Sequence, residues 1–183
     1  MKLVRSWPRK PPDNHPRIED NCPRITIDWC DYSALLQLND DVLHLDWDVA
    51  VGLDELQAFA DKCRSEPHLV RVAPTMSYPT RQRRWHPAPG TPKHYLVWDK
   101  ASWESDRKGL QPGTPYCNYF AFGMVYLPRW TLERFMDSIP NFGPTLNDVS
   151  FSVWYQAFTL GQPVPVEWDT HAVHLNFSMK DAI

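Results

Sequence analysis

The sequence has no excess of basic residues, no paired cysteines and no long apolar run. Its 183 residues carry 19 Lys and Arg against 22 Asp and Glu, a formal net charge of −3. A protein that binds duplex nucleic acid needs a broad basic face against the phosphates, so we expect no duplex partner. The cationic run at 81–86 is the local exception. Such a run is usually a solvated loop, and the alternative is an anion-binding loop.

Cysteine spacing and hydropathy exclude further classes of protein. None of the four cysteines forms a Cys-x-x-Cys pair, so we expect neither a disulfide framework nor a zinc ribbon. The first residues lack the apolar core of a signal peptide, and no apolar run approaches the length of a membrane span. We therefore expect a soluble, cytoplasmic protein without a membrane span, and its oligomeric state stays open.

Aromatic side chains are abundant, with nine Trp, eight Phe and seven Tyr. Large rings bury much area in a core, and they also stack on sugars and bases, so we expect most of them to be core and some to be functional. The chain has the length of one ordinary domain, which buries about 70% of the surface that its unfolded chain exposes.

The pattern of apolar residues predicts a proline-rich N-terminal arm over 1–24, followed by one α/β domain over 25–183. The run at 41–45 is apolar on both sides of the pleat, which is typical of a strand covered on both faces in a mostly parallel mixed sheet flanked by helices. Segment 31–38 fits a helix or a strand. The remaining strands are expected at 24–29, 68–74, 95–98, 119–127, 165–168 and 172–177, and helices at 53–60, 128–136 and from 147 to about 160.

Two carboxylates, Asp46 and Asp48, follow the apolar strand at 41–45. The carboxyl ends of strands are where ligands collect in open α/β sheets. Hard oxygen ligands suit Mg²⁺ or Mn²⁺, and such a cation bridges the oxygens of a diphosphate. The alternative is a turn in which the two acids cap the following segment.

Three further residues are candidates for chemistry. Asp148, at the start of a predicted helix, is either a helix N-cap or a general base that removes a proton from a hydroxyl. His171 and His174 lie near the C-terminus, where a neutral imidazole is a competent ligand for Mn²⁺. A single histidine in a strand is more often an ordinary hydrogen-bonded residue.

The order of these segments resembles the glycosyltransferases with the glycosyltransferase-A fold. The run Val-Leu-His-Leu-Asp-Trp-Asp at 42–48 is similar to the strand and D-x-D motif of that family. Residues 119–129 resemble its acceptor-side strand, and 147–152 resemble the segment that carries the base of inverting members. Residues 156–164 are similar to the helix end that follows, and His174 matches a late metal-ligating histidine. The resemblance covers about residues 40 to 178.

The resemblance implies a transferase that moves a sugar from a nucleotide-sugar donor to an acceptor hydroxyl, with inversion. Asp48, Asp46 and His174 would hold Mn²⁺ or Mg²⁺ on the diphosphate, and Asp148 would act as base. We assign further roles by residue type in the irregular stretch 77–115. These are arginines that close over the phosphates, Arg81, Arg83 and Arg84, and tryptophans that stack on sugar rings, Trp85, Trp98 and Trp103.

The N-terminal part is shorter than in that family. Only 45 residues precede the acidic motif, whereas family members use on the order of a hundred for the nucleotide-binding strands. The fold is therefore expected to be truncated at its nucleotide-binding part. Two other functions stay open on the sequence: a non-catalytic protein-binding module built on the shortened fold, and a metal-dependent phosphoesterase.

Overall fold

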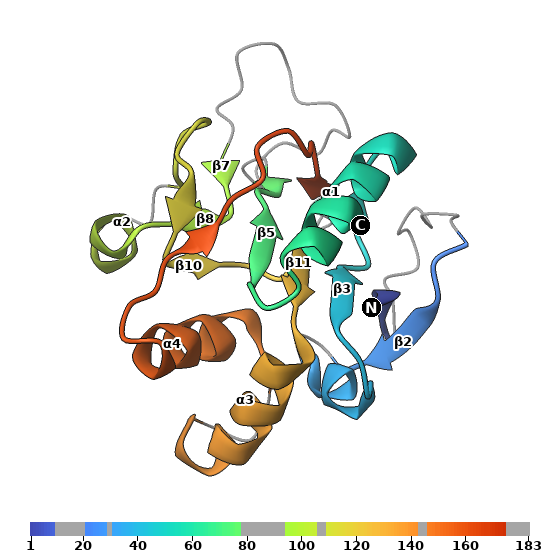
Figure 1. Ribbon diagram of the computed structural model, residues 1–183, viewed down its shortest axis with the longest axis horizontal. Helices are drawn as coiled ribbons and strands as arrows, with labels where there is room; N and C mark the ends of the chain where they lie inside the picture. Colours follow the sequence, from blue (N-terminus) through green and yellow to red (C-terminus); the bar gives the residue numbers. More distant parts are fainter. Residues whose placement is uncertain (10–20, 29–30, 78–93, 106–108, 143–145, 175–183) are drawn as a thin grey trace, which may run out of the picture.

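A mixed five-stranded sheet forms the centre of the computed structural model, which describes residues 1–9, 21–28, 31–77, 94–105, 109–142 and 146–174 (Figure 1). Ser77, His94, residues 139–142 and His174 are described by their backbone alone. The strands are β1 (Lys2–Pro8), β2 (Arg24–Ile27), β3 (Val42–Leu45), β5 (Arg71–Ala73) and β11 (Met124–Leu127), in the spatial order β2-β1-β3-β11-β5. β1 is parallel to β2 and β3, and β11 is antiparallel to β3 and β5. The prediction of one α/β domain with a mixed sheet flanked by helices is confirmed, and this sheet has as many antiparallel as parallel strand pairs.

The N-terminal segment belongs to this sheet. The prediction of an arm without a core over 1–24 is wrong for residues 2–8, which form β1 between β2 and β3. The prolines that suggested an arm lie mostly after Pro8, the last residue of the strand. Arg5 and Ser6 are polar but are 1% and 0% exposed, because distant parts of the chain supply their hydrogen-bond partners.

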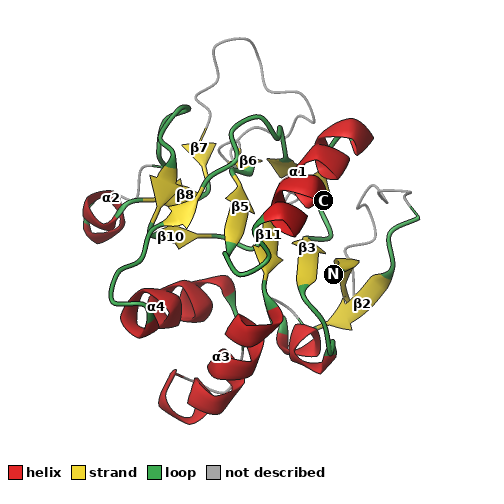
Figure 2. Ribbon diagram, viewed as in Figure 1, coloured by secondary structure: helices red, strands yellow, loops and turns green. Residues whose placement is uncertain are grey.

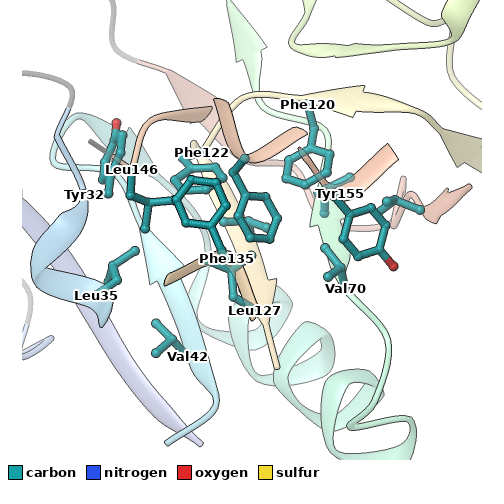
Figure 3. Packing of buried hydrophobic residues seen from close by; sticks show 14 of the residues in the cluster. Tyr32, Leu35, Val42, Val70, Phe120, Phe122, Leu127, Phe135, Leu146 and Tyr155 are labelled. Carbon is teal, nitrogen blue, oxygen red and sulfur yellow. The ribbon is translucent and has the colours of Figure 1, made fainter. Parts of the chain in front are cut away.

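Side chains alternate across the sheet and build two separate cores. Leu43 and Leu45 of β3 face α1 (Leu53–Ser65) and pack with its Phe59. On the other face, Val42 packs with η1 (Ser33–Gln37), α3 (Arg129–Phe142) and α4 (Asp148–Phe158). Figure 3 shows this second core, where Phe120 and Phe122, which precede β11, pack with rings from α3 and α4. Helices therefore cover both faces of β3. The carboxyl end of this central strand lies at the border of the sheet, beyond which the chain continues into Asp46.

The helices begin and end where local chemistry favours it. In α1, Asp54 and Glu55 lie in the first turn, and Lys62 and Arg64 in the last, which complements the helix dipole. α1 confirms the helix predicted at 53–60 and α3 the one at 128–136, while segment 31–38 forms the short 3₁₀ helix η1. The sequence analysis did not predict α2 (Lys100–Glu104), which begins after an Asp99 cap.

Short strands flank the main sheet (Figure 2). β4 (Val49–Ala50), β13 (Val173–His174), β6 (Met76–Ser77) and β7 (His94–Tyr95) form one four-stranded sheet in that order. Two strand pairs, β8 (Val97–Trp98) with β10 (Tyr119–Phe120) and β9 (Tyr116–Cys117) with β12 (Val164–Pro165), complete the described strands. The first of these small sheets brings the C-terminal segment against the residues that follow β3.

Candidate functional site

The first carboxylate of the predicted motif, Asp46, lies at the end of β3 and is 7% exposed. Its Oδ1 accepts hydrogen bonds from the Ser6 hydroxyl at 2.7 Å and from the Trp47 amide at 2.9 Å. Its Oδ2 accepts one from the Tyr32 hydroxyl at 3.1 Å. Both oxygens of Asp46 are therefore engaged by the protein itself.

The backbone around residues 46–48, which we call the acidic turn, is held from both neighbouring strands. Arg5 of β1 donates from one guanidinium nitrogen to the carbonyls of Asp46 and Val49, at 2.6 and 2.9 Å. The Asp46 amide donates to the carbonyl of Gly123, which precedes β11. A Cβ at Gly123 would lie 2.1 Å from the Thr75 hydroxyl, so only glycine permits this close approach.

The second carboxylate, Asp48, is 2% exposed and leads directly into β4. β4 pairs antiparallel with β13, and the register sets His174 opposite Val49. The backbone of His174 is thus next to the acidic turn, although the position of its side chain lies outside the description. His171 is placed differently: its Nδ1 lies 2.7 Å from Oε1 of Glu55 at the start of α1. This pairing lowers the pKa of Glu55 below its usual value.

Asp148 is the first residue of α4, and the structure separates it from the capping role. Asn147 is the N-cap: its side chain accepts from the Ser150 amide at 2.8 Å, and its own amide donates to the Ser150 hydroxyl at 3.0 Å. The interpretation of Asp148 as the N-cap is therefore wrong. Its Oδ1 accepts from the Val149 amide at 2.8 Å. Capping of α4 does not explain why residue 148 is an aspartate, because Asn147 is the cap.

Asp148 and Asp46 belong to one electrostatic site. Burial raises the pKa of Asp148, and the negative charge of Asp46 raises it further. Tyr32 connects the two segments, because its amide donates to the Leu146 carbonyl at 2.7 Å while its hydroxyl binds Asp46. The structure thus brings together the acidic turn and the head of α4, which are far apart in the sequence.

A buried histidine that the sequence analysis did not select lies under this site. His44 of β3 is fully buried against the rings of Tyr32 and Phe122, with centroids at 5.1 and 6.0 Å. Burial lowers the pKa of His44 to about 4, and the nearby charge of Asp46 only partly opposes this. His44 is therefore neutral at physiological pH. Its position on an apolar strand gave no sequence signal beyond the alternation itself.

The acidic turn offers a small set of possible ligands for a divalent cation. Among the described side chains, no three His, Cys, Asp or Glu residues gather as a ready-made metal site. Mg²⁺ and related cations often use only one or two protein carboxylates and take their other ligands from phosphates and water. Asp48, with the His174 backbone beside it, fits that pattern, whereas the Asp46 oxygens already accept three hydrogen bonds.

The other predicted site residues are divided between described and undescribed parts of the chain. Arg81, Arg83, Arg84 and Trp85 lie outside the described residues. Trp98 and Trp103 contact each other edge to face at 5.4 Å, and Trp103 stacks on Tyr119 at 4.8 Å. These two tryptophans belong to the unit formed by β8, α2 and β10, and stacking within the protein already covers one face of Trp103.

A cavity of about 550 Å³ lies on the α1 side of the acidic turn. Its walls are mostly apolar and come from β1, β3, β4 and α1 together with the residues before β2. Arg5 also lines it, so this side chain runs between the cavity and the carbonyls that it binds. The guanidinium is therefore supported by backbone groups of the turn, while its stem borders an apolar space.

The fold resembles that of A197 from STIV. The crystal structure of A197 superposes with a TM-score of 0.53 and 14% sequence identity, over 98% of this chain and 87% of A197. At this identity the likeness to A197 shows the fold alone. No family model matches the chain, and no curated protein matches it. None of the helices in the described part of the chain has the length and apolar character needed to cross a bilayer.

Proposed function

We propose that this protein is a metal-dependent glycosyltransferase that moves a sugar from a nucleotide-sugar donor to an acceptor hydroxyl, with inversion. The observation that carries the proposal is that Tyr32 joins the acidic turn to the head of α4: its hydroxyl binds Asp46 at the end of a central strand, and its amide binds the Leu146 carbonyl, just before Asp148. A second support is the pairing of β13 with β4, which brings the late histidine segment beside the acidic turn. These are the pieces that the glycosyltransferase-A resemblance requires at one site.

The start of the chain adds support from the donor side. β1 and β2 are parallel to β3 and precede it in the sequence, as the nucleotide-binding strands of that family do. Their carboxyl ends open at the same edge as the acidic turn, because parallel neighbours end on the same side of a sheet. On this proposal, β1 and β2 would supply a nucleotide-binding half shortened to two strands.

The proposed roles follow from the environment of each carboxylate. Asp48, together with His174, would hold a Mn²⁺ or Mg²⁺ ion, which when bound offsets the charge of the departing nucleoside diphosphate. Asp148 takes the proton of the acceptor hydroxyl, whose oxygen attacks the anomeric carbon as the bond to the diphosphate oxygen breaks. Its raised pKa makes the ionised carboxylate a stronger base. The electron pair of the broken bond leaves with the diphosphate.

Calorimetric titration tests the proposal. UDP, and separately GDP, is added to the protein with and without Mn²⁺, and the series is repeated on Asp48→Asn. The control is Asp169→Asn, because Asp169 is 93% exposed and Lys62 keeps Glu167 as a closer partner. We expect Mn²⁺-dependent binding of one nucleotide in the wild type and the control, and its loss in Asp48→Asn.

Two other results would contradict the transferase. Indifference of the folded protein to both nucleotides and to Mn²⁺ would favour a protein-binding module built on the same fold. Release of phosphate from a simple ester such as p-nitrophenyl phosphate, dependent on Mn²⁺ and on Asp48, would instead favour a phosphoesterase.

A further inference from the structure

We propose that Arg5 and Ser6 of β1 are positioning residues that set the acidic turn so that Asp48 holds the cation and Asp46 serves as an internal hydrogen-bond acceptor. The inference rests on the proposed function for its metal ion. The contacts of Arg5 and Ser6 join neighbouring strands, and no motif marks them, since the two residues lie 41 and 40 residues before Asp46.

Arg5 acts on the backbone of the turn. One guanidinium nitrogen donates to the carbonyls of Asp46 and Val49, the residues on either side of Trp47 and Asp48. A charge-assisted donor shared between these two carbonyls fixes their separation, and therefore the path of the chain through Asp48. The Val49 amide also donates to the Asp46 carbonyl at 3.2 Å, which closes the turn on itself.

Ser6 acts on the carboxylate of the turn from the other face of the sheet. Successive residues of a strand point to opposite faces, so Arg5 borders the cavity on the α1 side while Ser6 joins Tyr32 on the α4 side. The Ser6 hydroxyl and the Trp47 amide both donate to Oδ1 of Asp46, and Tyr32 donates to Oδ2. The Arg5-Ser6 dipeptide therefore holds the acidic turn by hydrogen bonds on both faces of the sheet.

In this arrangement Asp46 and Asp48 have different roles. A cation bound directly by Asp46 would have to displace hydrogen bonds from buried donors, which leaves those donors without partners at a cost. Asp48 lies beyond Asp46, directly before β4 and beside β13. Asp48 is therefore the carboxylate that the dipeptide presents to the ion, and Asp46 is the one that it uses as an anchor.

The test measures binding of Mn²⁺ alone, by the loss of the electron paramagnetic resonance signal of the free ion. We expect Asp48→Asn to abolish binding. Asp46→Asn should weaken it only about fivefold, the effect of removing one nearby charge. Arg5→Met and Ser6→Ala should each weaken it about tenfold, as loss of a group that orients a metal ligand does. Arg5→Lys, which keeps a cation at the same place, should recover part of the loss.

Matched controls and a metal-free readout separate positioning from general damage. Arg129→Met removes an exposed arginine paired with Glu133, and Ser138→Ala removes an exposed helix hydroxyl, and neither should change Mn²⁺ binding. Amide hydrogen exchange without metal should accelerate at Trp47–Val49 in Arg5→Met, while α3 and α4 exchange at the wild-type rate. Uniform acceleration over the whole chain would instead indicate a purely structural role and overturn the proposal.

Failure of the transferase proposal and failure of the positioning proposal give different results. If the wild type binds Mn²⁺ but no nucleoside diphosphate, the transferase fails and the order of the variants still decides the role of Arg5 and Ser6. The positioning proposal is overturned if Arg5→Met binds Mn²⁺ like the wild type, or if Asp46→Asn loses as much affinity as Asp48→Asn. It is also overturned if the wild type binds no Mn²⁺.

Discussion

At the scale of single residues, Asp148 shows how function and stability oppose each other at this site. An ionised carboxylate there is half-buried and faces the charge of Asp46, which raises its pKa. The folded protein therefore gains nothing from keeping Asp148 charged. Asn147 provides the cap of α4, and an amide at position 148 could still accept the hydrogen bond from the Val149 amide. A carboxylate at this position is better explained by chemistry than by stability.

Asp148→Asn is therefore expected to stabilise the fold at pH 7, by about 1 kcal/mol, while lowering the proposed transferase activity roughly 10²- to 10⁴-fold. Because the folded pKa of Asp148 is raised, its ionisation costs stability once the pH rises above the ordinary value of 3.8. The stabilisation should hence be full above the raised pKa and vanish below pH 3.8. Urea unfolding at several pH values measures it, with Asp137→Asn on the exposed side of α3 as control. Equal stability of Asp148→Asn and wild type at pH 7 would contradict the argument.

At the scale of elements, the residues at the two ends of α4 differ in how well they fit the backbone conformation there. The N-terminal end has a capping box, whereas the C-terminal end contains Leu160 at φ 54°, next to Gly161 at φ 88°. Leucine at positive φ is strained, and this side chain is 94% exposed, so no burial compensates. The termination of α4 thus places a large apolar residue where glycine or asparagine is preferred.

Leu160→Asn should stabilise the protein by about 0.5–1 kcal/mol, because asparagine tolerates the left-handed region better than leucine. Leu160→Ala is the matched control. It removes the same exposed apolar group but keeps a Cβ at positive φ, so its stability should stay close to that of the wild type. Denaturant midpoints of the three proteins measure the effect, and an equal gain in the alanine variant would show that backbone strain is not the cause.

Elements with a strong period were predictable, and those that depend on distant partners were not. The sequence predicted β3 and α1 because their apolar spacing is clear over several residues. It missed β1, since Arg5 and Ser6 look unsuitable for a buried strand until the acidic turn supplies their partners. Segment 31–38 was ambiguous because its short 3₁₀ helix is fixed by contacts with Leu146 and the sheet.

The same distinction holds at the candidate site. The residue types and positions of Asp46, Asp48 and Asp148 marked them as candidates, because carboxylates at the ends of strands and the starts of helices can bind a cation or act as a base. The sequence could not assign different roles to Asp46 and Asp48, since these depend on Ser6 and Tyr32, which lie 40 and 14 residues away. It also could not separate Asn147 from Asp148 as the cap of α4, because both residue types serve there.

At the scale of the whole molecule, the two buried titratable groups around the acidic turn give the fold opposite responses to acid. Asp148 favours its protonated form on folding and His44 its neutral form, since burial penalises the charged state of each. The pKa of His44 falls from 6.5 to about 4 in the folded protein. The unfolded chain therefore binds more protons than the folded one between these values, and acid destabilises the fold through His44.

This response predicts the acid limb of the stability curve. The contribution of His44 to stability, about 3 kcal/mol, is fully present above pH 6.5 and is lost as the pH falls toward about 4. His44→Leu keeps an apolar side chain of similar size against Tyr32 and Phe122 and has no proton to bind. Its unfolding free energy should fall less between pH 7 and pH 4, by up to that amount. The control His68→Leu changes an exposed histidine and should follow the wild type. Parallel curves for His44→Leu and wild type would mean that His44 does not set the acid sensitivity of this fold.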